Sequence, residues 1–189
     1  AWRILKRREA RLALRAQPGD RVLEIACGTG LNFPHLRQLI GDQGSLMGVD
    51  ITTAMLNIAR QEIARHGWQN VEVREADVAR LPFPDASFDK VFSAFALNII
   101  PEYERAIVEV QRVLVPGGRF VALEMRHMDV SSLSGWLGRL AHRLMGICAV
   151  DTSHHTIEAI QDTFGEVQVR RYLAGMVFIA MATKQGKAF

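Results

Sequence analysis

Two hydrophobic patterns alternate along the chain after Pro18-Gly19. Short apolar runs such as RVLEI (21–25) are typical of buried strands, and apolar residues at three- and four-residue spacing are typical of helices. The first pattern predicts strands over residues 21–25, 44–49, 71–74, 88–92, 120–123, 167–172 and 176–183. The second predicts helices over residues 32–40, 103–114, 133–145 and 156–163, and one that begins at Thr52 or Thr53 and stops at Gly67. Pro116-Gly117-Gly118 is expected to end the helix over residues 103–114.

This order of elements predicts an α/β fold. Five strand–helix alternations followed by two adjacent strands indicate a doubly wound, mainly parallel, seven-stranded sheet with a C-terminal antiparallel hairpin. We find no repeat and no second-domain boundary, so residues 1–189 are expected to form a single domain. No apolar run approaches the roughly 20 residues of a membrane span. Cys27 and Cys148 make no disulfide framework, which favours a cytoplasmic protein.

Positive charge is concentrated at the N-terminus. Residues 1–17 hold six of the 23 basic residues and one of the 20 acidic residues, which leaves 17 basic and 19 acidic groups elsewhere. This segment is predicted to be a basic N-terminal helix, and two interpretations remain open. It either contacts an anionic surface such as the inner face of a membrane, or packs its arginine stems on the core.

Candidate ligand-binding residues follow three successive strands. The Gly28/Gly30 loop follows the first, Asp50 ends the second and Asp77 follows the third. Open α/β sheets bind ligands at these strand ends. The glycines allow close backbone approach, Asp50 suits the two hydroxyls of a ribose, and Asp77 suits the amine of an adenine or merely caps its own loop. NAD is the weaker interpretation, because Phe33 occupies the position of the third glycine in the dinucleotide fingerprint.

Four segments within residues 18–125 carry a resemblance to a known family. VLEIACGTG, GVDITTAML, EADVARLPFPDASFD and RVLVPGGRF occur in that order. Together they resemble the motifs of class I S-adenosylmethionine-dependent methyltransferases, and are most similar to ubiquinone/menaquinone C-methyltransferases and bacterial phospholipid N-methyltransferases. The resemblance implies a Rossmann-like fold, S-adenosylmethionine as cofactor and S-adenosylhomocysteine as product. It further implies a cofactor site made of Glu24, Ala26, Gly28 and Gly30 along the methionine, Asp50, Ile51, Met55, Asp77 and Val78 around the ribose and adenine, and Ala94 and Phe95 behind the methyl group.

Candidate catalytic residues are Asn98, Glu124 and His127, near the ends of the fourth and fifth strands. Methyl transfer from a sulfonium depends mainly on alignment, and needs a strong base only if the nucleophile arrives protonated. Each residue has a structural alternative: a turn cap for Asn98, an arginine partner for Glu124 and a surface position for His127. No set of carboxylates, histidines or cysteines matches a divalent-ion site, so no metal is expected.

The likeness to the quinone enzymes ends after Glu124. Residues 126–155 are expected to form a substrate-side insertion, whose apolar stripe from Leu133 to Cys148 belongs either to the core or to the cover of an apolar substrate. With the basic N-terminus, this favours a small lipophilic or membrane-associated acceptor, either a phospholipid headgroup amine or a quinone-like ring. RNA or protein acceptors are disfavoured, because aromatic and basic residues do not interleave as in RNA-binding surfaces. A non-catalytic S-adenosylmethionine-binding protein remains a further alternative, and the acceptor atom (C, N or O) and the oligomeric state stay open.

Overall fold

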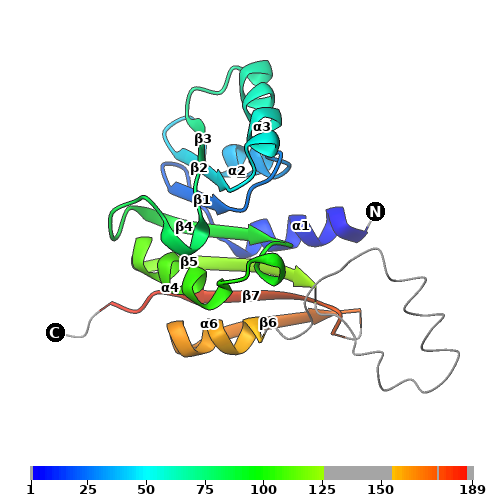
Figure 1. Cartoon of the computed structure of the whole chain (residues 1–189), viewed down its shortest axis with the longest axis vertical. Coiled ribbons are helices and arrows are strands. Elements are labelled where there is room, and N and C mark those ends of the chain that lie inside the picture. The colour runs from blue at the N-terminus through cyan, green and yellow to red at the C-terminus, as the bar shows by residue number, and fades with distance from the viewer. Residues whose placement is uncertain (1, 126–154, 174, 187–189) are drawn as a thin grey trace, which may run out of the picture.

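The computed structural model describes residues 2–125, 155–173 and 175–186 (Figure 1). Within them, one sheet lies between two layers of helices. The strands are β1 (Arg21–Ile25), β2 (Ser45–Asp50), β3 (Val71–Glu75), β4 (Phe88–Ala94), β5 (Leu114–Met125), β6 (Val167–Tyr172) and β7 (Val177–Thr183). The helices are α1 (Trp2–Ala13), α2 (Phe33–Ile40), α3 (Thr53–His66), α4 (Tyr103–Val113), α6 (Thr156–Phe164) and the short 3-10 turns η1 (Val78–Arg80) and η2 (Leu97–Ile99).

The sheet has the strand order β3-β2-β1-β4-β5-β7-β6. Strands β1 to β5 pair in parallel, and β7 is antiparallel to both of its neighbours. This confirms the predicted fold class, including the antiparallel hairpin. Because Val177 pairs with both Met125 and Tyr172, the turn between β6 and β7 returns at the edge where β5 ends.

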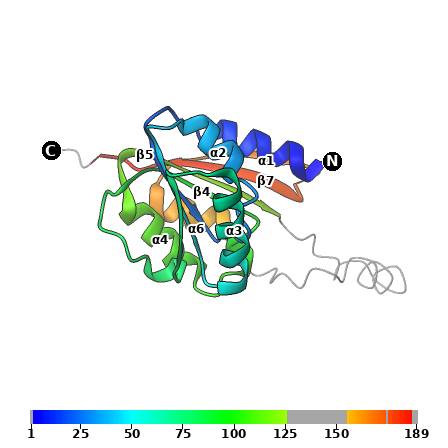
Figure 2. The ribbon, with the colours of Figure 1, turned by 90° about the horizontal axis from the view of Figure 1, so that it is seen from above.

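Alternate residues of the strands enter two separate cores. Val91 of β4 belongs to the core under α4 and α6, whereas its neighbour Phe92 belongs to the core under α1, α2 and α3. Figure 2 shows α1 and α2 on the opposite side of the sheet from α4 and α6. Burial of each large apolar side chain in such a core contributes about 1.5–3 kcal/mol. The period of two along the strands therefore fixes which side chains support each helix layer.

The prediction at Pro116-Gly117-Gly118 was wrong in one respect. The segment does not stand between a helix and a strand, because α4 ends at Val113 and β5 already begins at Leu114. The N–H of Gly117 donates to the carbonyl of Lys184 at 2.8 Å, and the N–H of Lys184 donates to the carbonyl of Gly118 at 2.9 Å. Pairing with a segment distant in sequence therefore extends the strand through residues that usually break one.

The basic N-terminal segment forms α1 and packs on the sheet. Ala10 and Leu14 are fully buried, Arg11 is 6% exposed, and Arg119 of β5 donates to the carbonyl of Ala13 at 2.7 Å. These contacts favour the interpretation in which arginine stems pack on the core. In the described part of the chain, no helix combines the length and apolar character that a membrane span requires. The predicted helix over residues 133–145 lies outside the described residues, as does the predicted insertion except for His155.

Candidate functional site

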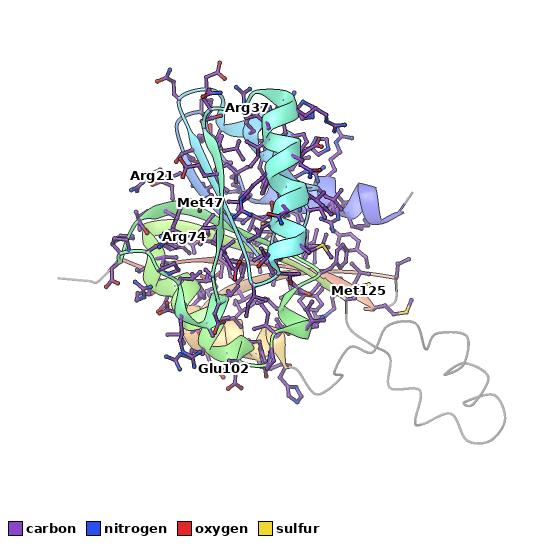
Figure 3. All side chains as sticks on the ribbon, turned by 45° about the horizontal axis from the view of Figure 1, so that its top comes forward. Arg21, Arg37, Met47, Arg74, Glu102 and Met125 are labelled. Atoms are coloured by element: carbon purple, nitrogen blue, oxygen red, sulfur yellow. The ribbon has the colours of Figure 1, made fainter. Side chains whose placement is uncertain are left out.

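The predicted site residues meet at the carboxyl ends of β1, β2 and β4. Strand β1 leads to α2 on one face of the sheet, and β4 leads to α4 on the other. The strand order reverses between β1 and β4, and α/β folds bind ligands at such a point of reversal. In Figure 1 the arrowheads of β4 and β5 point toward the side from which α1 begins. Met125, labelled in Figure 3, marks the end of β5 at this edge.

The glycine loop is joined to β2 by two hydrogen bonds. Ala26 has a positive φ of 46°, and Gly28 one of 56°. The N–H of Cys27 donates to the carbonyl of Val49 at 2.9 Å, and the N–H of Gly28 donates to Asp50 Oδ2 at 2.8 Å. Asp50 Oδ1 accepts the N–H of Thr52 at 2.9 Å. Each carboxylate oxygen of Asp50 thus accepts one backbone bond and keeps capacity for a further donor.

Phe33 explains why the loop differs from a dinucleotide site. A Cβ atom added to Gly30 would lie 2.6 Å from the Phe33 ring, and one added to Gly48 would lie 2.5 Å from it. The ring therefore fills the space between the loop and β2. In dinucleotide sites the third glycine keeps the helix close to the strand at this point. The packing gives a physical reason for disfavouring NAD.

Apolar side chains are exposed beside Asp50. Ile51 is 70% exposed and Met55 is 44% exposed, whereas Leu56 on the same helix is fully buried. Such an exposed apolar pair next to a carboxylate suits the face of a planar base beside its ribose.

Asp77 caps its own loop, which is one of the two roles that the sequence left open. Its Oδ1 accepts the N–H of Ala79 at 2.9 Å, and its Oδ2 accepts from Arg80 at 3.0 Å. Val78, the next residue, is buried. Asp77 therefore caps η1, and this also places its carboxylate at the end of β3 next to the predicted adenine position.

Glu24 is a buried carboxyl group with one partner. Asn32 Nδ2 donates to Glu24 Oε1 at 2.6 Å, while Oε2 is buried and has no hydrogen-bond partner. Burial raises the pKa of Glu24 to about 7, against the Asn32 bond and the positive charges of Arg7 and Arg11. An unpartnered buried carboxylate oxygen is rare in native structures and suits an ammonium donor.

Sequence reasoning identified Glu24 but missed its partners. Asn32 precedes α2, but its side chain makes no cap bond. It instead joins Glu24 to Arg11, whose guanidinium donates to Asn32 Oδ1 at 3.0 Å. The spacing of residues in the segment that forms α1 could have indicated these partners. Arg7 and Arg11 lie four residues apart, and the buried Leu14 follows at helical spacing, so both cations share the stripe that faces the core.

The loop after β4 is held in an unusual backbone conformation. Phe95 has a positive φ of 61°, which is rare for a bulky residue, and its N–H donates to the carbonyl of Leu123 at 2.7 Å. The guanidinium of Arg7 lies 5.2 Å from the centroid of the Phe95 ring. Phe95 thus lies beside α1, directly after Ala94, the last residue of β4.

Glu124 lies beneath that loop. It is fully buried, and its Oε1 accepts the N–H groups of Ala96 at 3.1 Å and Leu97 at 3.0 Å, while Oε2 has no partner. Burial raises the pKa of Glu124 to about 7, although the backbone N–H groups oppose the shift. Its partners are backbone amides and the hydroxyl of Ser93, which donates to Oε1 at 3.5 Å, and not the arginine that the sequence allowed.

Asn98 joins three elements. Its Oδ1 accepts from the hydroxyl of Thr156 at 3.0 Å, and its Nδ2 donates to the carbonyl of Met125. It therefore links η2 to the end of β5 and the start of α6. His127, the third predicted catalytic residue, lies outside the described residues.

The described ranges, 2–125, 155–173 and 175–186, contain no group of three or more His, Cys, Asp or Glu residues placed to hold a metal ion. Cys27 is buried near the carboxylates of Glu24 and Asp50, and this burial and these charges raise the pKa of its thiol. A thiol held protonated in this way is a poor nucleophile.

Residues 22–118 match a family described as methyltransferase domain. The chain is 41% identical over 109 residues to the ubiquinone/menaquinone biosynthesis C-methyltransferase UbiE of Teredinibacter turnerae, a match that covers 57% of this chain and 44% of that protein. It is 33% identical over 130 residues to the demethylmenaquinone methyltransferase of Listeria monocytogenes, covering 69% of this chain and 54% of that protein. The chain therefore spans about half the length of these curated relatives.

The fold also matches solved structures. A SAM dependent methyltransferase from Aquifex aeolicus superposes with a TM-score of 0.71 at 20% identity, covering 94% of this chain and 88% of that one. At this identity the match concerns the fold, and it agrees with the predicted Rossmann-like architecture.

Proposed function

Because the chain belongs to the class I S-adenosylmethionine-dependent methyltransferases, we propose that it transfers a methyl group from S-adenosylmethionine to a ring carbon of a quinone-like acceptor. The observation that carries the proposal is the 41% identity over 109 residues to a quinone C-methyltransferase. A phospholipid headgroup amine is the second acceptor class that the sequence motifs support.

The described residues fit the proposed cofactor. The unpartnered buried Oε2 of Glu24 is the acceptor that the methionine ammonium needs. Asp50 has one free acceptor position on each oxygen for the ribose hydroxyls, and the exposed Ile51 and Met55 would contact the adenine face. Asp77, in its place at the end of β3, would accept from the adenine amine.

When bound, S-adenosylmethionine supplies an activated methyl group on a sulfonium whose leaving group is a neutral thioether. Transfer would form a bond between the acceptor carbon and the methyl carbon as the carbon–sulfur bond breaks, and the ring carbon would then release its proton to water. The task of the protein is to align these atoms, which can supply roughly 7–11 kcal/mol. Ala94 and Phe95 would back the methyl group, because they lie at the end of β4, where the left-handed conformation of Phe95 turns the loop.

Glu124 and Asn98 remain candidates for the reaction, and their contacts support a positioning role. Glu124 holds the two N–H groups that follow Phe95, and Asn98 fixes the same loop to β5 and α6. Neither contact requires the side chain to touch the acceptor. The substrate-side role of residues 126–155, with His127, is part of the same proposal.

Exposed apolar groups at this edge support an apolar acceptor. Ile99, at the end of η2, is 63% exposed, and Leu173, in the turn after β6, is 49% exposed. Ile99 comes shortly after the end of β4, and Leu173 directly after the end of β6. Both therefore lie at the edge of the sheet where we place the methyl group. A lipophilic ring would cover them and gain about 25 cal/mol for each Å² of apolar surface removed from water.

A methyl-transfer assay tests the proposal. The full chain, with S-adenosylmethionine carrying a labelled methyl group, is offered a reduced demethylmenaquinone, the oxidised quinone, phosphatidylethanolamine vesicles, tRNA or a protein mixture. We expect label on a carbon of the reduced quinone and none on the oxidised form, because only the electron-rich hydroquinone ring is a carbon nucleophile. Label on phosphatidylethanolamine alone would replace the quinone assignment, label on tRNA or protein would move the acceptor to a macromolecule, and binding without any transfer would indicate a non-catalytic protein.

A further inference from the structure

Helix α1 buries the guanidinium of Arg11 close to the proposed cofactor site. Arg11 is 6% exposed between the fully buried Ala10 and the core residue Leu14. Burying a guanidinium is costly unless it is paired and hydrogen bonded. Burial lowers the pKa of Arg11, yet a guanidinium stays charged at neutral pH. A charge held in this position needs a reason beyond packing.

The hydrogen-bond partner of Arg11 is an amide that is itself bound to a carboxyl group. Arg11 Nη1 donates to Asn32 Oδ1 at 3.0 Å, and Asn32 Nδ2 donates to Glu24 Oε1 at 2.6 Å. We call these three residues the Arg11–Asn32–Glu24 network. A cation at one end of an amide and a carboxylate at the other polarise the amide in the same direction, which strengthens both bonds. The network occupies Oε1 of Glu24 and leaves Oε2 without a partner.

We infer that Arg11 is a positioning residue for the cofactor, which acts through Asn32 to keep Glu24 ionised and its Oε2 directed to the ammonium group of the methionine part. The inference rests on the proposed function, since it requires that S-adenosylmethionine binds at this edge. It makes α1 part of the cofactor site, although the residues of α1 precede the sequence motifs that carry the resemblance to the family.

The charges around Glu24 support the need for such a residue. Arg7 and Arg11 of α1 face it with positive charge and oppose the burial that raises its pKa to about 7. Asn32 donates to it, and the Cys27 thiol responds to the negative charges of both Glu24 and Asp50. Loss of the Arg11 cation would therefore favour the protonated, neutral carboxyl at neutral pH, and a neutral carboxyl is a weaker partner for an ammonium.

Three ligands separate the network from other roles of Arg11. S-adenosylhomocysteine has both the ammonium and the carboxylate, its deaminated analogue keeps only the carboxylate, and 5′-methylthioadenosine has neither. Affinities at pH 7 are measured by calorimetry for the unmodified chain and for Arg11→Met. Arg8→Met is the matched control, because it removes the same charge from the exposed side of the same helix.

We expect Arg11→Met to weaken S-adenosylhomocysteine by about tenfold, as for loss of a charge-assisted interaction, and to leave the other two ligands within about twofold. Arg8→Met should leave all three unchanged. An equal loss for all three ligands would show a merely structural role and overturn the inference. A loss shared by S-adenosylhomocysteine and the deaminated analogue would show that Arg11 binds the carboxylate, which also overturns it. If the unmodified protein bound none of the ligands, the proposed function itself would fail.

The pH profile and a conservative variant provide a second readout. In the unmodified protein, affinity for S-adenosylhomocysteine should rise as the pH passes through about 7, because Glu24 ionises there. In Arg11→Met this rise should move to higher pH, and Arg11→Lys, which restores the charge, should move it back. Binding of 5′-methylthioadenosine confirms in each case that the variant is folded. A rise at the same pH in all three proteins contradicts the inference.

Discussion

Glu124→Gln should change how the stability of the protein depends on pH. Glu124 is fully buried, and its pKa is raised to about 7 from an ordinary value of 4.5 because burial penalises the charged form. A raised pKa means that the folded state prefers the protonated group. The associated stability is present below pH 4.5 and is lost as the pH rises through about 7.

The size of the effect follows from the two pKa values. Each pKa unit corresponds to about 1.4 kcal/mol, so this one group should cost the folded protein about 2 kcal/mol of unfolding free energy between pH 5.5 and 8.5. A glutamine keeps an oxygen that accepts the N–H groups of Ala96 and Leu97, and it places its amide group where Oε2 lies. That amide group lacks an acceptor, which costs about 1–3 kcal/mol at every pH.

Urea denaturation at pH 5.5 and pH 8.5 measures the difference. We expect Glu124→Gln to be less stable than the unmodified protein at pH 5.5, and this gap to narrow by about 2 kcal/mol at pH 8.5. Glu24 titrates in both proteins, so its contribution cancels. Glu158→Gln, on the exposed side of α6, controls for the loss of one carboxyl group. A gap of equal size at both pH values would refute the reasoning, because it would mean that the buried carboxyl does not change its charge in this range.

Three further outcomes are expected. Asp50→Ala should weaken S-adenosylhomocysteine binding by at least tenfold, a loss of about 1.5–3 kcal/mol. It should also lower the melting temperature, because the N–H groups of Gly28 and Thr52 lose their acceptor. Calorimetry that finds NAD bound as tightly as S-adenosylmethionine would contradict the cofactor assignment. Methyl transfer should survive EDTA, and loss of activity that magnesium restores would reveal a metal site. The full chain should co-sediment with anionic vesicles at low salt and dissociate as salt is added, with about 1 kcal/mol from each basic residue near the surface. Arg8→Glu should weaken this association and leave cofactor affinity unchanged, whereas absence of sedimentation at low salt would restrict α1 to its role in the fold.

The strands, and the placement of the candidate site residues at strand ends, could be predicted because both depend on local pattern. Short apolar runs identified the strands, and the rule for parallel sheets placed Asp50 and Asp77 at the carboxyl edge without knowledge of any contact. The start of β5 was missed because proline and glycine usually interrupt helices and strands. Here the backbone of Lys184, 66 or more residues away, forms the hydrogen bonds that extend β5.

The partners of the buried carboxyl groups depend on tertiary structure. Arg11 lies 21 positions from Asn32 in sequence, and only the packing of α1 brings the two together. Glu124 accepts from backbone amides 27 and 28 positions earlier. Almost every residue has such an amide, so the sequence does not show which ones will bind a carboxylate. Sequence patterns thus located both carboxyl groups, but not the groups that decide their charge.

The position of β7 has a consequence for synthesis of the chain. β7 follows β6 in sequence but lies between β5 and β6, and six of its seven residues are buried. Until the ribosome has released residues 177–183, β6 has no neighbouring strand in the described sheet, and β5 presents an unpaired apolar edge to the cell. A nascent chain halted near residue 172 would therefore be prone to aggregate and a natural client for chaperones, although its cofactor motifs were already complete.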